Sequence, residues 1–237
     1  MSTIGIIGSG NIGSAVARLA TQAEFTTIIA NSRGPASLTD LVADLGPRAS
    51  AGTVEQAASA DIVVVAVPLT VTLALPPELV AGTTVLDSSN YYPSRDGRIA
   101  ELDDNSSTTS EFVQAHLAKS RLVKAFNNIL AHHITELARP AGADDRSALP
   151  LAGDHPDAVA AAAGFIDALG FDTVDTGPLS DSWRLEPETG GYTQLYLVDP
   201  SVAYEQIMTT ASAPLPADRL RRALADVPRI DVGSRTA

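Results

Sequence analysis

Three glycines near the N-terminus restrict the possible folds of this chain more than any other feature. Residues 8–13 read GSGNIG, which has the spacing G-x-G-x-x-G, and they follow the short apolar run Thr3–Ile7. The next stretch, Asn11–Gln22, places its apolar residues on one face, as an amphipathic helix does. A strand, a glycine turn and a helix in this order form the first unit of a dinucleotide-binding fold. The alternative is a glycine-rich turn that binds no ligand.

Each glycine has a separate physical role in such a unit. Gly8 permits the tight turn, Gly10 lets the backbone approach a pyrophosphate, and Gly13 allows the helix to pack closely on the strand. The pyrophosphate is then held by the unpaired N–H groups and the positive dipole end of the helix. The predicted cofactor contacts of this loop are Gly8, Ser9, Gly10, Asn11, Ile12 and Gly13.

The end of the second predicted strand, Thr26–Ala30, indicates which dinucleotide is bound. An NAD site has Asp or Glu near this point to bond the ribose 2′-hydroxyl. Here the sequence reads Asn31, Ser32 and Arg33, so no carboxylate repels a phosphate. Ser32 offers a hydroxyl and Arg33 a planar fork suited to phosphate oxygens. We therefore expect NADP(H) as the cofactor.

Apolar runs and helix-like stretches alternate along most of the chain. This rhythm predicts an α/β Rossmann fold, a doubly wound parallel sheet with helices on both faces and a small C-terminal α/β extension. We expect residues 1–177 to form the NADP-binding domain with its added strands. Residues 178–237 would close the substrate cleft. Further strands are expected at Asp61–Val67, Thr83–Ser88, Arg121–Phe126, Ala148–Ala152 and Asp172–Asp175, and further helices at Leu38–Leu45, Pro156–Leu169 and Asp218–Val227.

Two segments do not follow this rhythm. Residues 91–110 are polar and rich in turn residues, and they are long for a structureless connection, so a functional loop is expected there. The last ten residues carry no regular pattern and are expected to fray.

Composition excludes several classes of function. The chain carries 16 Lys and Arg against 28 Asp and Glu, a net charge of −12, which disfavours binding to nucleic acid or to an anionic membrane. It has no cysteine, so thiolate metal sites and thiol nucleophiles are excluded, and we expect no metal. No apolar run approaches the length of a membrane helix, and the N-terminus lacks a signal peptide, so we expect a cytoplasmic protein.

Segments spread over about residues 3–197 resemble the NADP-dependent oxidoreductases of the deazaflavin coenzyme F420. The glycine loop, NSRG at Asn31, VVVAVP ending at Pro68 and VLDSSN at Val85 carry this resemblance. It continues with VKAFNNI at Val123, LPLAGD ending at Asp154 and LGFDTVDTGPLSDSWRLE ending at Glu186. The combination of KAFNNI with AGD and VDTGPL is much more specific than the glycine spacing. The resemblance implies hydride transfer between NADP(H) and a planar acceptor, deazaflavin F420 or a flavin.

The resemblance also implies roles for individual residues. Ser9, Ser32 and Arg33 match the residues around the adenosine 2′-phosphate. The segment beneath the nicotinamide ribose is matched by Val67, Pro68 and Leu69, and the cleft wall by Ser88, Ser89 and Asn90. The stretch that faces the nicotinamide and the acceptor ring is matched by Asn127, Asn128 and Ile129, which would position the rings without acid–base chemistry.

Other readings of the sequence remain open. The enzyme could reduce a small imine or carbonyl substrate, with Tyr91, Tyr92 or a histidine as the proton donor, or the chain could be a non-catalytic NADP-binding sensor. Lys124, Arg121 and Arg184 are the available cations for an acidic deazaflavin tail. His132 and His133 are expected to be ordinary core or surface residues, and Trp183 could pack internally or stack on a substrate. Family members are typically homodimers, and the apolar segment Tyr192–Val198 could pack against a second copy.

Overall fold

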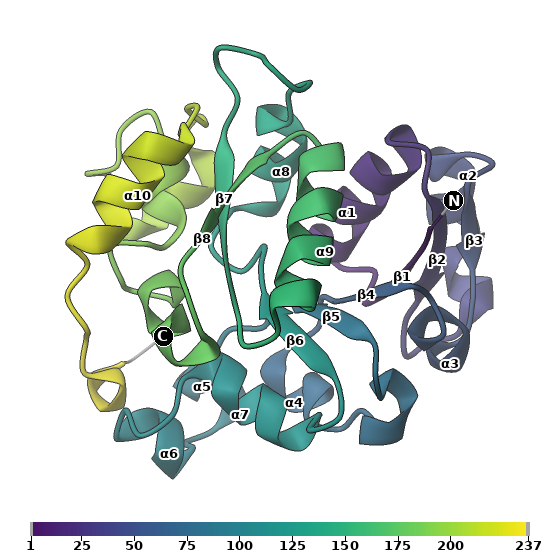
Figure 1. Cartoon of the computed structure of the whole chain (residues 1–237), viewed down its shortest axis with the longest axis horizontal. Helices are drawn as coiled ribbons and strands as arrows, with labels where there is room; N and C mark the ends of the chain where they lie inside the picture. The colour runs from purple at the N-terminus through teal and green to yellow at the C-terminus, as the bar shows by residue number, and fades with distance from the viewer. Residues whose placement is uncertain (1, 236–237) are drawn as a thin grey trace.

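The computed structural model describes residues 2–235, with only the backbone of residues 204 and 205. An eight-stranded sheet in the order β3-β2-β1-β4-β5-β6-β7-β8 runs through the molecule (Figure 1). All neighbouring strands pair in parallel except β6 and β7, which are antiparallel. The strands are β1 Thr3–Ile7, β2 Thr26–Ala30, β3 Ala49–Ala51, β4 Ile62–Val65, β5 Thr84–Asp87, β6 Arg121–Lys124, β7 Ala148–Gly153 and β8 Asp172–Asp175.

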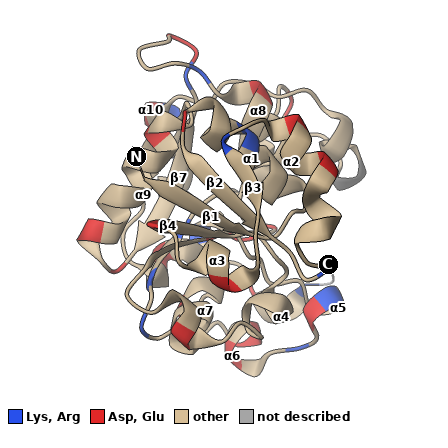
Figure 2. Ribbon diagram, turned by 90° about the vertical axis from the view of Figure 1, so that its right-hand side faces the viewer, with Lys and Arg blue, Asp and Glu red and all other residues tan. Residues whose placement is uncertain are grey.

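Helices cover both faces of the sheet. In Figure 2, α1 (Asn11–Gln22), α2 (Thr39–Leu45) and α8 (Ala131–Leu137) lie above it, and α3 (Val54–Ala58), α4 (Leu69–Thr72) and α7 (Thr109–His116) lie below it. Two further helices pack on β7 and β8, namely α9 (Pro156–Ala168) and α10 (Ala217–Ala225). The expected Rossmann-type α/β fold is therefore confirmed.

The central strands show why their sequences are apolar throughout. Val64 of β4 belongs to one hydrophobic cluster, whereas its neighbours Val63 and Val65 belong to the cluster on the opposite face. All three side chains are fully buried. A parallel strand covered by helices on both sides needs apolar residues at every position rather than at alternate ones.

The direction of β7 differs from the all-parallel sheet that the sequence suggested. The helix α8 between β6 and β7 has 7 residues, which is a length of only about 10 Å. The connection therefore does not cross back to the opposite edge of the sheet, as a parallel strand would require. Instead β7 starts near the edge where β6 ends and runs antiparallel to it. The three-residue edge strand β3 was not predicted at all, because its sequence ASA carries no apolar alternation.

The polar segment 91–110 is not an open loop. It contains α5 (Pro93–Asp96) and α6 (Ala100–Asp103), and it begins with Tyr91, which is fully buried. The Tyr91 hydroxyl donates a hydrogen bond of 2.8 Å to Asp103. The segment is therefore folded and anchored by a buried tyrosine, and a function for it stays a prediction.

The C-terminal residues also pack more firmly than expected. Residues 179–235 consist mainly of single helical turns and α10. Near the end, Arg235 is 1% exposed and forms an ion pair of 3.3 Å with Glu186. The prediction of a frayed tail is thus wrong as far as residue 235, and residues 236–237 lie outside the described part.

Within residues 2–235, none of the helices combines the length and the apolar character that a membrane-spanning segment requires.

Candidate active site

The glycine loop lies at the carboxyl end of β1, where the sequence placed it. Gly8 has a φ of +116°, a conformation that glycine adopts readily, and a Cβ atom here would lie 2.3 Å from the carbonyl oxygen of Ala66. A Cβ atom on Gly13 would lie 1.9 Å from the carbonyl oxygen of Gly8. At Gly10 an added Cβ atom meets nothing within 4 Å. Two glycines are therefore required by the protein itself, whereas Gly10 leaves space beside the backbone.

That space lies at the start of a long helix. Gly10 is the N-cap of α1 and provides no side chain to cap it. The first-turn N–H groups of α1, which begins at Asn11, can therefore reach an anion directly. Ser9 is partly exposed and Asn11 is exposed beside this opening, while Ile12 packs against the core. The loop thus fits a pyrophosphate as the sequence implied.

The end of β2 is joined to the glycine loop by one amide side chain. Asn31 donates hydrogen bonds from Nδ2 to the hydroxyls of Ser9 at 2.9 Å and Ser37 at 3.1 Å, and its Oδ1 accepts from the backbone N–H of Arg33 at 2.9 Å. Ser32 and Arg33 are exposed. Among residues 2–235 the guanidinium of Arg33 has no hydrogen-bond or ion-pair partner. It can therefore bind a phosphate without first breaking an ion pair.

The ends of β4 and β5 lie next along the same edge. Val67 is partly exposed, Pro68 is exposed, and Leu69 is fully buried as the first residue of α4. The Ser88 hydroxyl donates a hydrogen bond of 3.2 Å to the carbonyl oxygen of Val65 at the end of β4. These residues form the part of the edge between the glycine loop and β6.

A buried ion pair supports the ends of β5 and β6. Nζ of Lys124 lies 3.1 Å from the Asp87 carboxylate, and both side chains are fully buried. Lys124 also donates to the carbonyl oxygen of Ser89, and the Ser89 hydroxyl donates to Asp87 at 2.7 Å. This network fixes the backbone on which Asn90 is carried.

Asn90 and Asn127 hold the two strand ends together. Nδ2 of Asn90 donates to the carbonyl oxygen of Asn127 at 2.9 Å, and Nδ2 of Asn127 donates to Oδ1 of Asn90 at 3.1 Å and to the carbonyl oxygen of Leu185 at 2.7 Å. Asn128 donates to the carbonyl oxygen of Gly191 at 3.0 Å, and Ile129 is buried below. The Oδ1 atoms of Asn127 and Asn128 are buried without a hydrogen-bond partner among the described residues.

A pair of tyrosine hydroxyls adjoins this amide pair. The hydroxyl oxygens of Tyr92 and Tyr192 lie 2.6 Å apart, and Nδ2 of Asn90 donates to the Tyr192 hydroxyl at 3.3 Å. Sequence reasoning named Tyr92 but missed Tyr192, which joins the site from 100 residues further along the chain. Tyr91, in contrast, points to Asp103 in the interior, and its burial raises the pKa of its hydroxyl.

Comparison with known proteins agrees with this geometry. Residues 3–91 match the model of a family described as NADP oxidoreductase, coenzyme F420-dependent. A hypothetical protein of Sinorhizobium meliloti, SMa0349, is 34% identical over 79% of this chain and 91% of its own, with a TM-score of 0.70. The chain belongs to the coenzyme F420-dependent NADP oxidoreductase family.

Two further matches are weaker, one because its sequence identity is lower and the other because it covers less of the chain. A candidate F420-dependent NADP reductase of Arthrobacter sp. FB24 is 22% identical, covers 77% of this chain and 87% of its own, and has a TM-score of 0.64, which shows a shared fold. The protein YjhV of Escherichia coli K12 is 42% identical over 53 residues, which are 22% of this chain and 39% of YjhV. The curated relative is therefore matched over about two fifths of its length.

The cations that the sequence offered for the deazaflavin tail of an F420-dependent oxidoreductase all have other contacts. Lys124 is buried with Asp87. Arg121 begins β6 at the edge opposite the glycine loop and pairs with Asp157 at 2.6 Å. Arg184 pairs with Asp181 at 2.6 Å and lies 4.4 Å above the ring of Trp183. The expected role of these three residues is therefore not supported, because each charge is already balanced inside the chain.

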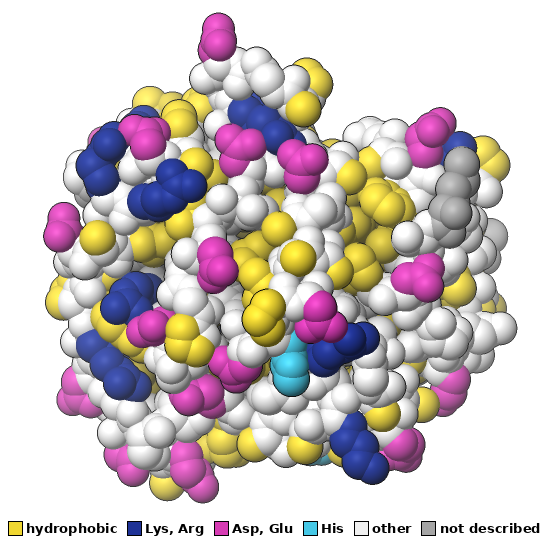
Figure 3. Space-filling view, in the orientation of Figure 1, with side chains coloured by type: hydrophobic (Ala, Val, Ile, Leu, Met, Phe, Trp, Pro, Cys, Tyr) yellow, Lys and Arg dark blue, Asp and Glu magenta, His cyan; other side chains and the backbone are white. Residues whose placement is uncertain are grey.

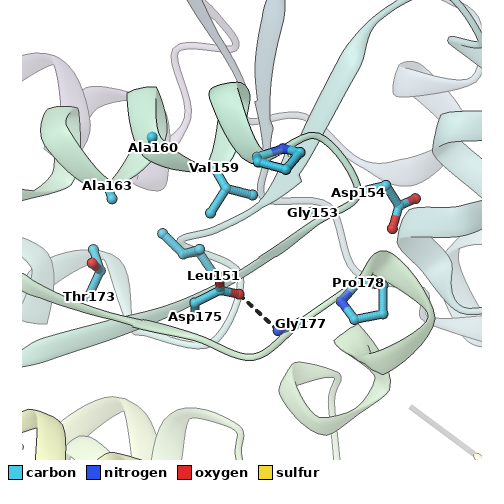
Figure 4. Close-up of a pocket in the computed structure, with 11 residues that line it drawn as sticks. Leu151, Gly153, Asp154, Val159, Ala160, Ala163, Thr173, Asp175, Gly177 and Pro178 are labelled. Atoms are coloured by element: carbon cyan, nitrogen blue, oxygen red, sulfur yellow. Dashed lines mark hydrogen bonds between the residues drawn. The ribbon is translucent and has the colours of Figure 1, made fainter.

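One sizeable cavity of this F420-dependent NADP oxidoreductase family member lies away from the glycine loop. It has a volume of about 540 Å³ and lies between α9 and the strands β7 and β8, with Leu151 and Val159 on its walls (Figure 4). Hydrophobic side chains gather on both sides of α9 in Figure 3. Because β7 and β8 run opposite to β6, their carboxyl ends lie at the amino edge of the other strands. The cavity is thus separate from the candidate active site.

Tyr192–Val198, the segment expected to pack against a second copy, packs mostly against other parts of the same chain. Tyr196 is fully buried and its hydroxyl donates a hydrogen bond of 2.9 Å to the carbonyl oxygen of Ala148. Leu197 is also buried, whereas Val198 is 66% exposed. The homodimer therefore stays a prediction, with Val198 as the main apolar side chain that this segment leaves at the surface.

Proposed function

We propose that this NADP-dependent oxidoreductase transfers a hydride between NADP(H) and a planar acceptor ring, a deazaflavin or a flavin, at the carboxyl edge of β1 to β6. The observation that carries this proposal is the hydrogen-bonded wall of neutral amides formed by Asn90, Asn127 and Asn128, on the same edge of the sheet as the glycine loop. Amide groups can hydrogen-bond the polar edge of a flat ring without exchanging a proton. The nicotinamide, when bound, supplies or takes up the hydride.

The chain's own residues account for the rest of the chemistry. The glycine loop and the first turn of α1 would bind the pyrophosphate, and Arg33 with Ser32 would bind the 2′-phosphate. The Asp87–Lys124 pair and the Asn90–Asn127 hydrogen bonds hold the wall rigid. Hydride transfer needs the two reacting carbons at about 3–3.5 Å in a fixed orientation, which a rigid wall can provide without a titrating group.

Recognition of the acceptor would rest on its ring rather than on an acidic tail. Lys124, Arg121 and Arg184 are each paired with a carboxylate. A deazaflavin without its charged tail should therefore be reduced about as well as the complete coenzyme. The experiment is to follow NADPH consumption with complete F420, the tail-less deazaflavin, FMN and FAD. No turnover with any of these acceptors would refute the proposal.

The hydroxyl pair of Tyr92 and Tyr192 favours a second function, the reduction of a small imine or carbonyl compound. Such a reaction needs a proton donor beside the hydride acceptor, and two hydroxyls at 2.6 Å next to Asn90 are the best-placed group. Turnover with a panel of imines and ketones, in the absence of turnover with the planar acceptors, would establish this alternative instead.

A further inference from the structure

His133 presents a problem that the proposed hydride chemistry does not solve. Its side chain is fully buried in α8, and neither Nδ1 nor Nε2 makes a hydrogen bond of normal geometry among residues 2–235, although the Thr210 backbone lies close to the ring. A neutral imidazole carries one donor and one acceptor, and burying both without partners is unfavourable. A bound water or ion is one kind of partner that satisfies such buried atoms.

Two other ligand-type side chains stand beside it. His132 and Glu136 lie at the surface on the same helix, and the potential ligand atoms of all three residues lie within 4.8 Å of one another. The two imidazole rings have centroids 4.2 Å apart at an angle of 65°. Glu136 is one helical turn beyond both histidines, so the helix itself brings the carboxylate and the rings together.

One neighbouring side chain already holds the carboxylate of this cluster. The Ser212 hydroxyl donates a hydrogen bond of 3.0 Å to the Glu136 carboxylate. Hydrogen bonds of this kind orient metal-binding carboxylates.

We propose that His132, His133 and Glu136 bind one divalent transition-metal ion, for which Zn²⁺ is the best match. Two imidazole nitrogens and one carboxylate form a common zinc donor set, with a water in the fourth position. The exposed side chains of His132 and Glu136 give the ion a path from solvent to the buried His133. From the sequence we expected no metal, because the adjacent histidines were assigned an ordinary core or surface role.

The position of this site suggests what an ion would do. The helix α8 follows Asn127, Asn128 and Ile129 along the chain and packs against α1. An ion on α8 would therefore stabilise a helix that lies behind both the amide wall and the glycine loop. Its effect on the proposed hydride transfer would be indirect, since no ligand of the ion belongs to that site.

The test is zinc binding by the untagged full-length protein, measured by calorimetry after treatment with a chelator. We expect one Zn²⁺ per chain and a rise in the unfolding temperature when Zn²⁺ is added. His132→Gln and Glu136→Gln should each weaken binding by at least about tenfold. His155→Gln is the matched control, because His155 is exposed at the start of α9 and outside the cluster. Co²⁺ should give the absorption bands of a four-coordinate site.

The result can exclude the site independently of the proposed function. The two test variants change surface side chains, and unfolding in the presence of chelator shows whether each remains folded. Absence of one-to-one Zn²⁺ binding would overturn the proposal. So would native affinity in either His132→Gln or Glu136→Gln, because the site needs both residues. NADPH turnover is measured separately and does not enter this test.

Discussion

Replacing Gly10 by alanine separates the binding role of the glycine loop from its structural role. Gly10 has a φ of −76°, which alanine adopts without strain, and an added Cβ atom has no protein neighbour within 4 Å. The fold should therefore tolerate Gly10→Ala, and the reduced freedom of the unfolded chain can raise stability by about 0.4–1 kcal/mol. A bound pyrophosphate, in contrast, would have to move away from the new methyl group.

The expected loss of affinity follows from that displacement. Forcing an extra methyl group into a close contact typically costs about 1–3 kcal/mol, which is a factor of about 5–150 in Kd. Calorimetric titration with NADPH measures this factor, and thermal unfolding checks the fold. Gly164→Ala is the matched control, because Gly164 also has no neighbour within 4 Å of an added Cβ atom and lies within α9.

The pair of variants gives a clear criterion. Gly164→Ala should bind NADPH as the native protein does, whereas Gly10→Ala should bind it more weakly at unchanged or higher stability. Native affinity in a folded Gly10→Ala variant would refute the assignment of the pyrophosphate to this loop.

Three further variants test other parts of the account. Arg33→Ala should weaken NADPH binding by about 10–150-fold through loss of charge-assisted hydrogen bonds of about 1.5–3 kcal/mol but leave NADH binding nearly unchanged. Arg48→Ala, which removes an ion pair with Glu24, is its control, and equal weakening of both nucleotides by Arg33→Ala would contradict the 2′-phosphate role. Lys124→Met leaves the buried Asp87 carboxylate without its cation and should lower the free energy of unfolding, measured in urea, by about 3–5 kcal/mol. A decrease below about 1 kcal/mol, as is typical of surface ion pairs, would contradict the structural role of this pair. Tyr192→Phe should lower kcat with a planar acceptor less than about tenfold, whereas loss of about 100-fold or more would indicate a proton donor and favour imine or carbonyl reduction.

The local parts of the fold could be predicted because their signals lie within short stretches of sequence. Thr3–Ile7, Asn11–Gln22 and Thr26–Ala30 form a strand, a helix and a strand with the predicted bounds. The glycine spacing also identified which glycines the turn needs. These features depend on residues that are neighbours in the chain, so periodicity and backbone preference are sufficient to find them.

The remaining features depend on contacts between distant residues. The reversed direction of β7, the burial of Arg235 against Glu186 and the meeting of Tyr192 with Tyr92 leave no local pattern. Lys124 was one of the few cations available as a contact for an acidic coenzyme tail, and only the position of Asp87 on the neighbouring strand β5 explains its burial. An apolar strand with a charged residue at its end could have suggested such a pair.

Deuterium transfer shows whether hydride passes from the nicotinamide to the acceptor ring. NADPH labelled with deuterium at the nicotinamide C4 position would be incubated with the protein and a deazaflavin, and the reduced acceptor analysed by mass spectrometry. Carbon-bound deuterium does not exchange with water, so its origin is unambiguous. We expect the label to move from the nicotinamide to the deazaflavin ring. Binding of NADPH without transfer of the label to a deazaflavin, combined with no turnover of flavins, would contradict it.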